Sequence, residues 1–600
     1  MRPRVSCKLT MPIPENSLPD DAPEQRIVDT RQSSSAAESI PSECGASNRI
    51  EVSRAGLRIF RQGWTAWMVV ATSLPYLWNF FVRPHGSRYA WILPPFRDDS
   101  YGYMAWSQQA AHGALLFKLK FTALPQTAFL FQPFFLVCGW ACRLSGANLG
   151  PVHFVAKEVG VVLFFLLFYR YTDYLRLSAF QSLVASVLVG ISSGLGGATA
   201  LLFGQHEPPN ISADLWMPEV STFWSLLWNP LFPWSLALML LAIYWLDRGT
   251  RDARPRDLWL AGLAAGVLAL IHPYSQPLLL AFAVLVIVVR GRVPHVRPSF
   301  GLTWASGTLG YLLRYLLPLA PFAGYVAAVS VLQPVVVQHS AHGSMDSPSL
   351  LLYLSGFGLP LLIWASGWAI DRGRWMKQYW HLVAWFGLSL ALAYAPLWFQ
   401  RKLIMGAHIP LCILAAISFD LLLAKYCGSV KTARFALAAA TVILVPLLAL
   451  TQIYLIVELN REVQVNVFGV YYISPGVDAG LNYLKQHSKP DDVVMASLGT
   501  SLLIPAYAGN TVVWGHWAMA VDTEERKAWS RDLFSPPQNW YDDARAKKFW
   551  GSGIDYIFAD GVIKKAMEKT EFYKWQTILD DAQEVFRNKD VVIYRHRPLP

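Results

Sequence analysis

Charged residues are scarce in this 600-residue chain. They make up 15% of it, whereas 54% of its residues are hydrophobic. A soluble protein of this size would need more polar surface, so the composition excludes a soluble enzyme. Several apolar runs reach the roughly 20 residues that cross a bilayer core, where only a helix pairs every backbone polar group internally. The sequence therefore predicts an α-helical polytopic membrane protein.

Other signals are missing as well. The six cysteines show no CxxC spacing and none follows Cys427, so no disulfide framework is expected in the C-terminal part. That part also lacks a Gly-rich nucleotide fingerprint. Residues 1–63 contain neither an apolar core nor a signal-peptide pattern, and we expect a disordered cytoplasmic tail there.

The basic balance of the chain does not point to nucleic acid. The net charge is +11, but the Lys and Arg residues fall mainly between apolar runs. Membrane topology and contact with anionic lipid explain such a distribution better than a nucleic-acid surface does. The lipid bilayer of the cell membrane is therefore the first partner that we expect.

The apolar runs predict about eleven to twelve transmembrane helices within a domain over 64–457. Basic connectors should face the cytoplasm. This places the N-terminus inside and the C-terminus outside if the run 126–142 does not cross. We expect that run to lie along the membrane within a long first outer loop, 84–150; the alternative, in which it crosses and another run does not, stays open. The other runs lie at 64–83, 151–170, 179–203, 223–246, 257–272, 275–290, 304–332, 349–370, 380–398, 404–424 and 432–457.

The chain becomes polar after about residue 458. Strand-like segments such as DYIFAD and VVIYRH alternate with helical ones, including stretches near 523–550. This alternation predicts a small extracytoplasmic α/β domain over 458–600.

The first outer loop carries the most suggestive motif, PFRDDSYGYMAWSQQAAHG, in which Asp98 and Asp99 are adjacent. One carboxylate can act as a general base toward an acceptor hydroxyl, and the second can orient it or raise its pKa by repulsion. Together they could also hold Mg²⁺ or Mn²⁺. Capping of a helix that begins near Ser100 explains the same pair equally well.

Further polar residues are predicted on the same outer face. Glu219 lies in one outer loop and His272 in a tight HPYSQP turn. Arg401 and Lys402 break the topology rule, because they are basic on the outer side; they suit a phosphate group, or they snorkel at a helix end. Carboxylates beside a phosphate clamp suggest group transfer from a phosphorylated lipid.

The layout resembles the GT-C superfamily of membrane glycosyltransferases, which use polyprenyl-phosphate-linked sugars. RDDSYGYMAWSQQAAHG resembles the acidic motif of their first outer loop, and FQRKLIMGAHIPL resembles their basic segment for the lipid phosphate. PAYAGNTVVWGHWAMAVDTEERK resembles a stretch in C-terminal domains of bacterial members. The sequence DDSY departs from the DE-x-x-Y of the protein O-mannosyltransferase and aminoarabinose-transferase branches, and no WWDxG-type motif of oligosaccharyltransferases is found.

The resemblance implies an inverting hexosyl- or pentosyltransferase. It would move a sugar from a polyprenyl-phosphate donor to an unknown acceptor, which could be a glycan, a lipid or a protein. The resemblance makes Asp98 the base or a metal ligand, with Asp99 second and Glu219 lining the site. The residues predicted to bind substrate are Tyr101, Tyr103, His272, Arg401, Lys402 and His516, the last within Gly515-His516-Trp517.

Two other functions stay open. The chain could be a transporter or flippase of lipid-linked glycans, although it shows no internal repeat. It could also be a non-catalytic GT-C-like subunit that serves in assembly, which one sequence does not separate from an enzyme.

Overall fold

The computed structural model describes residues 50–204, 210–291, 304–337, 345–516, 519, 549–569 and 573–597. The predicted helical stretches near 523–550 lie almost wholly outside these residues, as do Trp517 and most of the tail predicted over 1–63. The end of that tail is helical instead, because α1 begins at Arg54, where the Ser53 hydroxyl accepts a hydrogen bond from the Gly56 amide at 3.0 Å.

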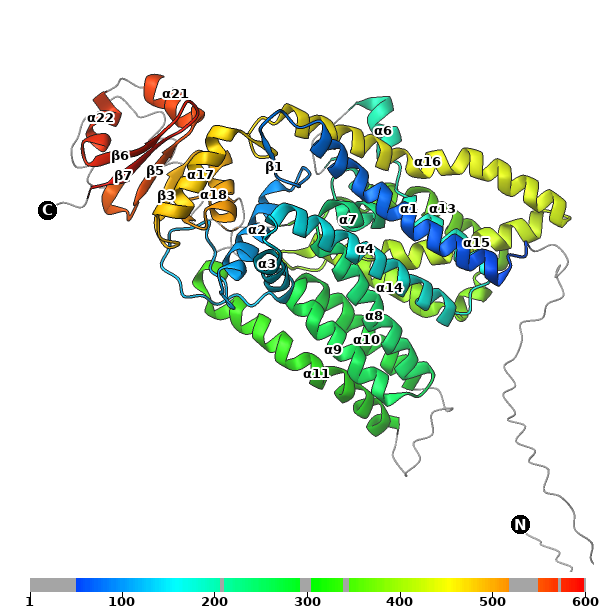
Figure 1. Cartoon of the computed structure of the whole chain (residues 1–600). Helices are drawn as coiled ribbons and strands as arrows, with labels where there is room; N and C mark the ends of the chain where they lie inside the picture. The colour runs from blue at the N-terminus through cyan, green and yellow to red at the C-terminus, as the bar shows by residue number, and fades with distance from the viewer. Residues whose placement is uncertain are drawn as a thin grey trace, which may run out of the picture. The chain divides into compact units, whose positions relative to one another are not determined.

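Long apolar helices build the body of the molecule, from residue 54 to residue 465 (Figure 1). Within the residues that the structure describes, seven helices are long and apolar enough to cross a membrane, or eight if the bent pair α5 and α6 is one span. The sequence predicted about eleven spans because it also counted α1, α9 and α14 as crossing helices. Of these, α9 is short and α14 is shorter still. The helices are α1 (Arg54–Phe81), α4 (Leu149–Tyr174), α5 (Ala179–Ile191), α6 (Gly196–Phe203), α7 (Thr222–Trp228), α8 (Leu231–Arg251), α9 (Pro255–Ile271), α10 (Gln276–Gly291), α11 (Trp304–Leu332), α13 (Leu350–Asp371), α14 (Trp380–Leu392), α15 (His408–Tyr426) and α16 (Val430–Val465).

The first outer loop contains the helices α2 (Arg97–Ala111) and α3 (Pro133–Ser145), which pack against each other. At 13 residues α3 is shorter than a membrane span. The predicted course of the run 126–142 along the membrane stays a prediction.

The C-terminal part contains a five-stranded sheet in the order β4-β3-β5-β7-β6. Strands β3, β4 and β5 are parallel, while β7 pairs antiparallel with β5 and β6. The predicted α/β character is therefore confirmed. The elements are β3 (Val493–Ala496), β4 (Thr511–Val512), β5 (Tyr556–Ala559), β6 (Ala582–Arg587) and β7 (Val592–His596), with helices α17 (Pro475–His487), α18 (Leu498–Tyr507), α21 (Gly561–Lys569) and α22 (Tyr573–Asp580).

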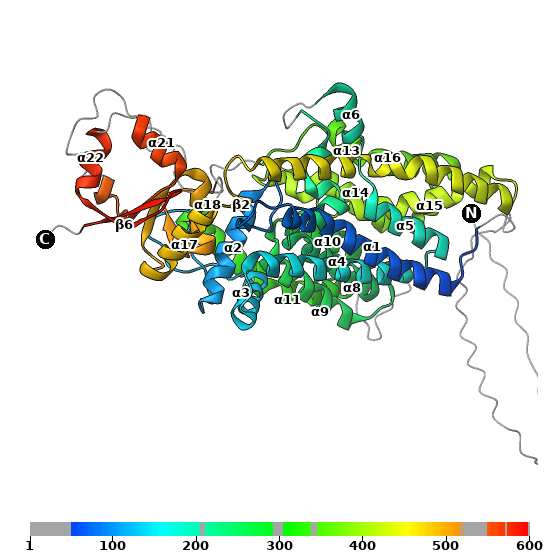
Figure 2. The ribbon, with the colours of Figure 1, turned by 45° about the horizontal axis from the view of Figure 1, so that its top comes forward.

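Both faces of this sheet are covered. Alternate residues of a strand point to opposite sides, so neighbouring residues pack against different elements. Val494 and Phe558 belong to the large core that includes α17 and the helical body, whereas Met495 and Ile557 pack with residues of α21 and α22. Figure 2 shows α21 and α22 on the side of the sheet away from α18.

Several contacts join the first outer loop to the C-terminal part. Strand β1 (Arg88–Tyr89) pairs with β2 (Tyr472–Ile473). The Lys120 ammonium donates to the Pro490 carbonyl at 2.7 Å, and α18 packs along α2. Helix α2 is therefore held between the helical body and the sheet, where its carboxylates can meet residues of both.

Candidate functional site

The two adjacent carboxylates of α2 have different surroundings. Neighbouring residues on a helix point about 100° apart, so the two side chains diverge. The Asp98 Oδ1 lies 3.6 Å from the Arg97 Nε, and Asp99 Oδ1 lies 3.4 Å from the His516 Nε2. Both lie in the first turn of α2, where a carboxylate also stabilises the helix dipole. Asp99 thus contacts His516, a second residue of the predicted site, and the predicted role of Asp98 stays a prediction.

Gly102 of α2 packs closely against Met519 and also contacts the ring of His516. A Cβ built on Gly102 would lie 2.8 Å from the Met519 Cε and 3.6 Å from the His516 Cδ2. The Met519 amide donates to the His516 Nδ1 at 3.2 Å, which leaves the Nε2 of a neutral ring to carry the proton toward Asp99. A residue of the C-terminal part thus completes the surroundings of a carboxylate in the first outer loop.

Glu219 and Lys402 form a buried ion pair. Glu219 lies in the short 3-10 helix η3 (Pro218–Val220), and Lys402 in η6 (Gln400–Ile404). The Lys402 Nζ donates to the Glu219 Oε1 at 2.5 Å, and the two side chains are 11% and 2% exposed. Burial raises the pKa of Glu219, but Lys402 and Arg401 lower it by more, so the pKa lies below its usual value. The glutamate is therefore ionised and paired.

The guanidinium of Arg401 lies over an aromatic ring. The guanidinium carbon lies 5.1 Å from the centre of the Trp216 ring. The backbone amide of Arg401 donates to the Met345 carbonyl, which fixes the segment that follows α14. A planar guanidinium held this way presents its N–H groups at its edge.

The charges of these groups reach Asp99. Burial raises the pKa of Asp99, but His516, Lys402 and Arg401 together lower it to below its usual value. The Asp99 side chain is 23% exposed, in contrast to that of Glu219. It is therefore an ionised carboxylate within reach of a ligand.

Two further predicted residues border this cluster. Tyr103 stacks on Phe135 with 4.7 Å between ring centres, and its pKa is raised well above the usual value, first by burial and then by Asp99 and other neighbours including Glu219. The buried His272 follows the end of α9 and bonds through its Nδ1 to the Ser275 hydroxyl at 2.8 Å. The ring of Tyr274 lies 5.5 Å from that of His272.

Tyr101 does not join the cluster. It is fully buried, and its hydroxyl donates to the Val470 carbonyl at 2.5 Å. The side chain faces the C-terminal part and anchors α2 there, and its predicted contact with substrate stays a prediction.

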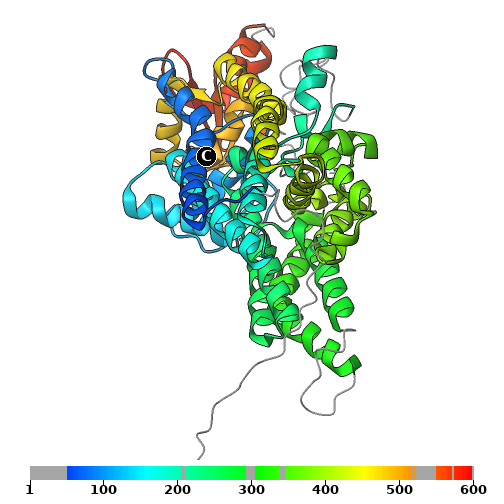
Figure 3. The same cartoon turned by 90° about the vertical axis from the view of Figure 1, so that its right-hand side faces the viewer.

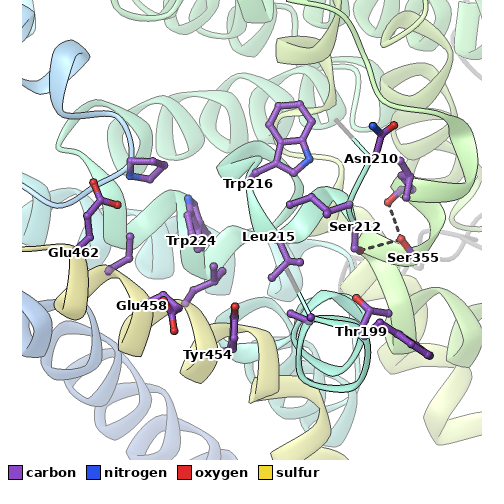
Figure 4. A pocket seen from close by; sticks show the side chains of 18 of the residues that line it. Thr199, Asn210, Ser212, Leu215, Trp216, Trp224, Ser355, Tyr454, Glu458 and Glu462 are labelled. Carbon is purple, nitrogen blue, oxygen red and sulfur yellow. Dashed lines mark hydrogen bonds between the residues drawn. The ribbon is translucent and has the colours of Figure 1, made fainter. Parts of the chain in front are cut away.

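A cavity of about 930 Å³ opens beside the cluster (Figure 4). Trp216 and Trp224 line one wall, and Tyr454 and Glu458 of α16 line another. Pro95, just before α2, borders the cavity as well. The cavity is mainly apolar, and Trp216 in its wall is the residue on which the Arg401 guanidinium stacks.

The predicted divalent cation does not fit the donor set around Asp99. Among the described residues, no three His, Cys, Asp or Glu side chains lie close enough together to hold a metal ion. The neighbours that lower the pKa of Asp99 include Lys402 and Arg401, which are cations and not metal ligands. The Mg²⁺ or Mn²⁺ predicted at Asp98 and Asp99 remains a prediction, and no step below depends on it.

Several members of the site carried no signal of their own in the sequence. Trp216 was one of 25 tryptophans, and Met519 and Gly102 act only through their contact with His516. Tyr274 lies in the same turn as His272. The HPYSQP turn is unusual between two apolar runs, and this could have indicated that Tyr274 belongs to the site.

The chain resembles several solved structures. No protein-family profile and no curated protein matches it. It aligns with the oligosaccharyltransferase AglB from Archaeoglobus fulgidus, solved with an inhibitory peptide and a dolichol-phosphate, at 14% identity and a TM-score of 0.47, over 86% of this chain and 71% of that one. It aligns with ArnT from Cupriavidus metallidurans, solved bound to undecaprenyl phosphate, at 14% identity and a TM-score of 0.45, over 89% and 98%.

A third match is the arabinofuranosyltransferase AftD from Mycobacteria, at 15% identity and a TM-score of 0.47, over 91% of this chain and 42% of that one. All the TM-scores lie below 0.5, and at this distance no residue's role is transferred from them.

Proposed function

We propose that this chain is a membrane glycosyltransferase that moves a sugar from a polyprenyl-phosphate donor to an acceptor hydroxyl, with inversion. One observation carries the proposal: an accessible carboxylate, a guanidinium and a buried ion pair meet although they come from separate parts of the chain. The positive charges of Lys402 and Arg401 both lower the pKa of Asp99, and Lys402 contacts Glu219. Such a meeting of a base and cations suits the transfer of a group that departs from phosphate.

Asp99 is the general base in this proposal. Its lowered pKa keeps it ionised at neutral pH, so it can accept the proton of the acceptor hydroxyl. The acceptor oxygen bonds to the anomeric carbon as the bond from that carbon to the phosphate oxygen breaks. The electron pair of the broken bond leaves with the polyprenyl phosphate.

Arg401 is the main partner of the departing phosphate. Its stacking on Trp216 leaves the guanidinium edge available for two parallel hydrogen bonds to phosphate oxygens. Because Lys402 already neutralises Glu219, the pair acts on the phosphate mainly as a fixed dipole and less as a free positive charge. As negative charge develops on the phosphate, these cations stabilise it.

The cavity gives the donor room. Its volume of about 930 Å³ lies at the upper end of the usual range for ligand pockets. Trp216 belongs both to the cavity wall and to the Arg401 stack, so a phosphate at Arg401 lies at the edge of the cavity. The apolar lining from α6, α13 and α16 suits the first isoprene units of the lipid.

The decisive experiment compares two neighbouring carboxylates. Purified protein would be reconstituted with a panel of polyprenyl-phosphate sugars and a membrane extract as the acceptor source, and release of polyprenyl phosphate would be followed. Asp99→Asn should lower turnover roughly 100- to 10,000-fold, because the base is lost. Asp98→Asn is the matched control, and it should retain most turnover, since Asp98 lies beside Arg97.

The thermal midpoint of each variant would show that the fold survives. Full turnover in well-folded Asp99→Asn would refute the assignment of the base. If the wild-type chain released polyprenyl phosphate from no donor in the panel, the transferase proposal would fail and transport or a binding role would replace it.

A further inference from the structure

A second cavity lies at the other end of the helical body. It has a volume of about 890 Å³ and is lined by α1, α4 and the start of α5. Helix α1 runs from this cavity toward the first outer loop (Figure 1). Its 28 residues span roughly 40 Å at about 1.5 Å per residue. The cavity is therefore separate from the candidate site, on the side that the basic connectors predict to be cytoplasmic.

The α1 wall of this cavity changes from charged to apolar along the helix. Arg54, Arg58 and Arg61 line it at its N-terminal end, and Thr65 and Val69 continue the same stripe toward the middle of α1. The spacings of four, three, four and four residues keep these side chains on one helix face.

The α4 wall changes in the same spatial direction. Arg61 pairs with Asp173, while Thr72 bonds to Glu158, so the two helices run antiparallel. Along α4 the lining passes from Asp173 through Tyr169 to Leu166 and Val162. Both walls thus offer a polar mouth and an apolar interior.

The mouth keeps an excess of positive charge. The Arg61 guanidinium is used within the fold, because it contacts the Asp173 carboxylate at 2.7 and 3.0 Å and the Ser182 hydroxyl at 2.8 Å. Arg54 and Arg58 are exposed and line the same mouth. With Asp173 neutralised by Arg61, these two arginines give the mouth a net charge of about +2, which needs an anionic ligand.

We propose that this cavity binds an anionic glycerophospholipid of the surrounding leaflet. Its phosphodiester would accept hydrogen bonds from Arg54 and Arg58 at the mouth. One acyl chain would lie along Val69, Val162 and Leu166, whose apolar side chains match it. The charge and the polarity gradient favour this occupant over a free phosphate ion, which would leave the apolar interior unfilled.

The test uses the full chain in detergent, titrated with palmitoyl-oleoyl phosphatidylglycerol or with the zwitterionic phosphatidylcholine of the same chains. Native mass spectrometry counts the lipids retained per protein. The wild-type chain should retain phosphatidylglycerol in preference. The double variant Arg54→Gln, Arg58→Gln should lose about 30-fold in affinity, from two basic contacts near an anionic headgroup.

The matched control removes two other exposed basic residues, by Lys431→Gln and Arg434→Gln at the start of α16. This control should bind phosphatidylglycerol as the wild type does. Equal retention of the two lipids, an equal loss in the control, or displacement of the lipid by millimolar inorganic phosphate would each overturn the proposal. Because Arg54 and Arg58 lie far from Asp99, polyprenyl-phosphate release by the double variant separates this outcome from the proposed function.

Discussion

Glu219 and Lys402 form the buried ion pair of the candidate site, and the stability of the fold depends on both charges. The carboxylate is almost completely buried, and Lys402 approaches within 2.5 Å. A buried carboxylate that loses its partner keeps its desolvation cost. The pair therefore stabilises the fold at neutral pH as long as both members are present.

The pair predicts a pH dependence with a definite sign. The pKa of Glu219 is lowered in the folded chain, so its contribution to stability is complete above the unfolded value of about 4.3 and is lost as the pH falls further. Lys402→Met should lower the free energy of unfolding by about 3–5 kcal/mol at pH 7. The variant should then gain thermal stability on acidification, since protonation removes the unpaired charge.

Thermal midpoints at pH 7 and pH 5 in one detergent would measure this response. The double variant Lys402→Met, Glu219→Gln is the control, and it should recover most of the lost stability. A Lys402→Met variant that loses stability between pH 7 and pH 5 to the same extent as the wild type would contradict the buried pair.

The sequence identified both members of this pair but not their contact. They lie 183 positions apart, and no local pattern links residues at that distance. The same limit applied to Asp98 and Asp99. Their adjacency indicated an acidic site, but which of them faces the cations depends on the rotation of α2 against the C-terminal part, as the contact of Asp99 with His516 shows.

At the level of elements, α2 positions its carboxylate through a close approach. Gly102 leaves room for His516 and Met519, and Tyr101 fixes the same helix through the Val470 carbonyl. The helix is thus held on two neighbouring faces by segments from the C-terminal part.

A larger residue at position 102 should move His516 away from Asp99. Gly102→Val would place its side chain against Met519 and His516, and a displacement of about 1 Å at a reacting group lowers turnover roughly 100-fold. Gly63→Val in α1 is the matched control, because a Cβ there meets nothing within 4 Å. Turnover and thermal midpoint would be measured for both; a Gly102→Val variant as active as the control would show that His516 does not position Asp99.

Elements with a clear hydrophobic period were predictable, and irregular ones were not. Runs such as VVMA and YIFA mark β3 and β5 directly. Strand β6 was missed because AQEVFR is polar and carries a bulge between Glu584 and Phe586, which breaks the alternation of two. The start of α1 was missed because its first turns are basic and exposed, where they line the mouth of the second cavity.

At the scale of the whole molecule, the fold gathers the candidate site at one end of the helical body and the arginine-lined cavity at the other. Figure 3 shows the body from the end of α1 and α16 that is remote from the sheet. The sequence predicted two chemically different ends through its basic connectors and its acidic outer loops. It did not predict the cavities, because each is formed by helices that are distant in the chain.

This polarity predicts the orientation of the chain. Alkaline phosphatase fused after Pro600 should be active, because the C-terminal part is expected outside the cytoplasm. The same enzyme fused after Arg374, within a basic connector, should be inactive, as the distribution of Lys and Arg requires. Green fluorescent protein fusions at the two positions should give the opposite pattern. An active fusion at Arg374 together with an inactive one at the C-terminus would invert the topology.

The contacts between the first outer loop and the C-terminal part impose an order of events during synthesis. Strand β1 finds its partner β2 only after α16 has been made, and the Tyr101 hydroxyl waits for a carbonyl 369 positions later. His516 arrives later still. A ribosome that stalls before that point leaves a chain whose helices can already be inserted but whose acidic loop has not matured. We therefore expect the candidate site to be completed late in biogenesis, and products truncated before His516 to lack the proposed activity.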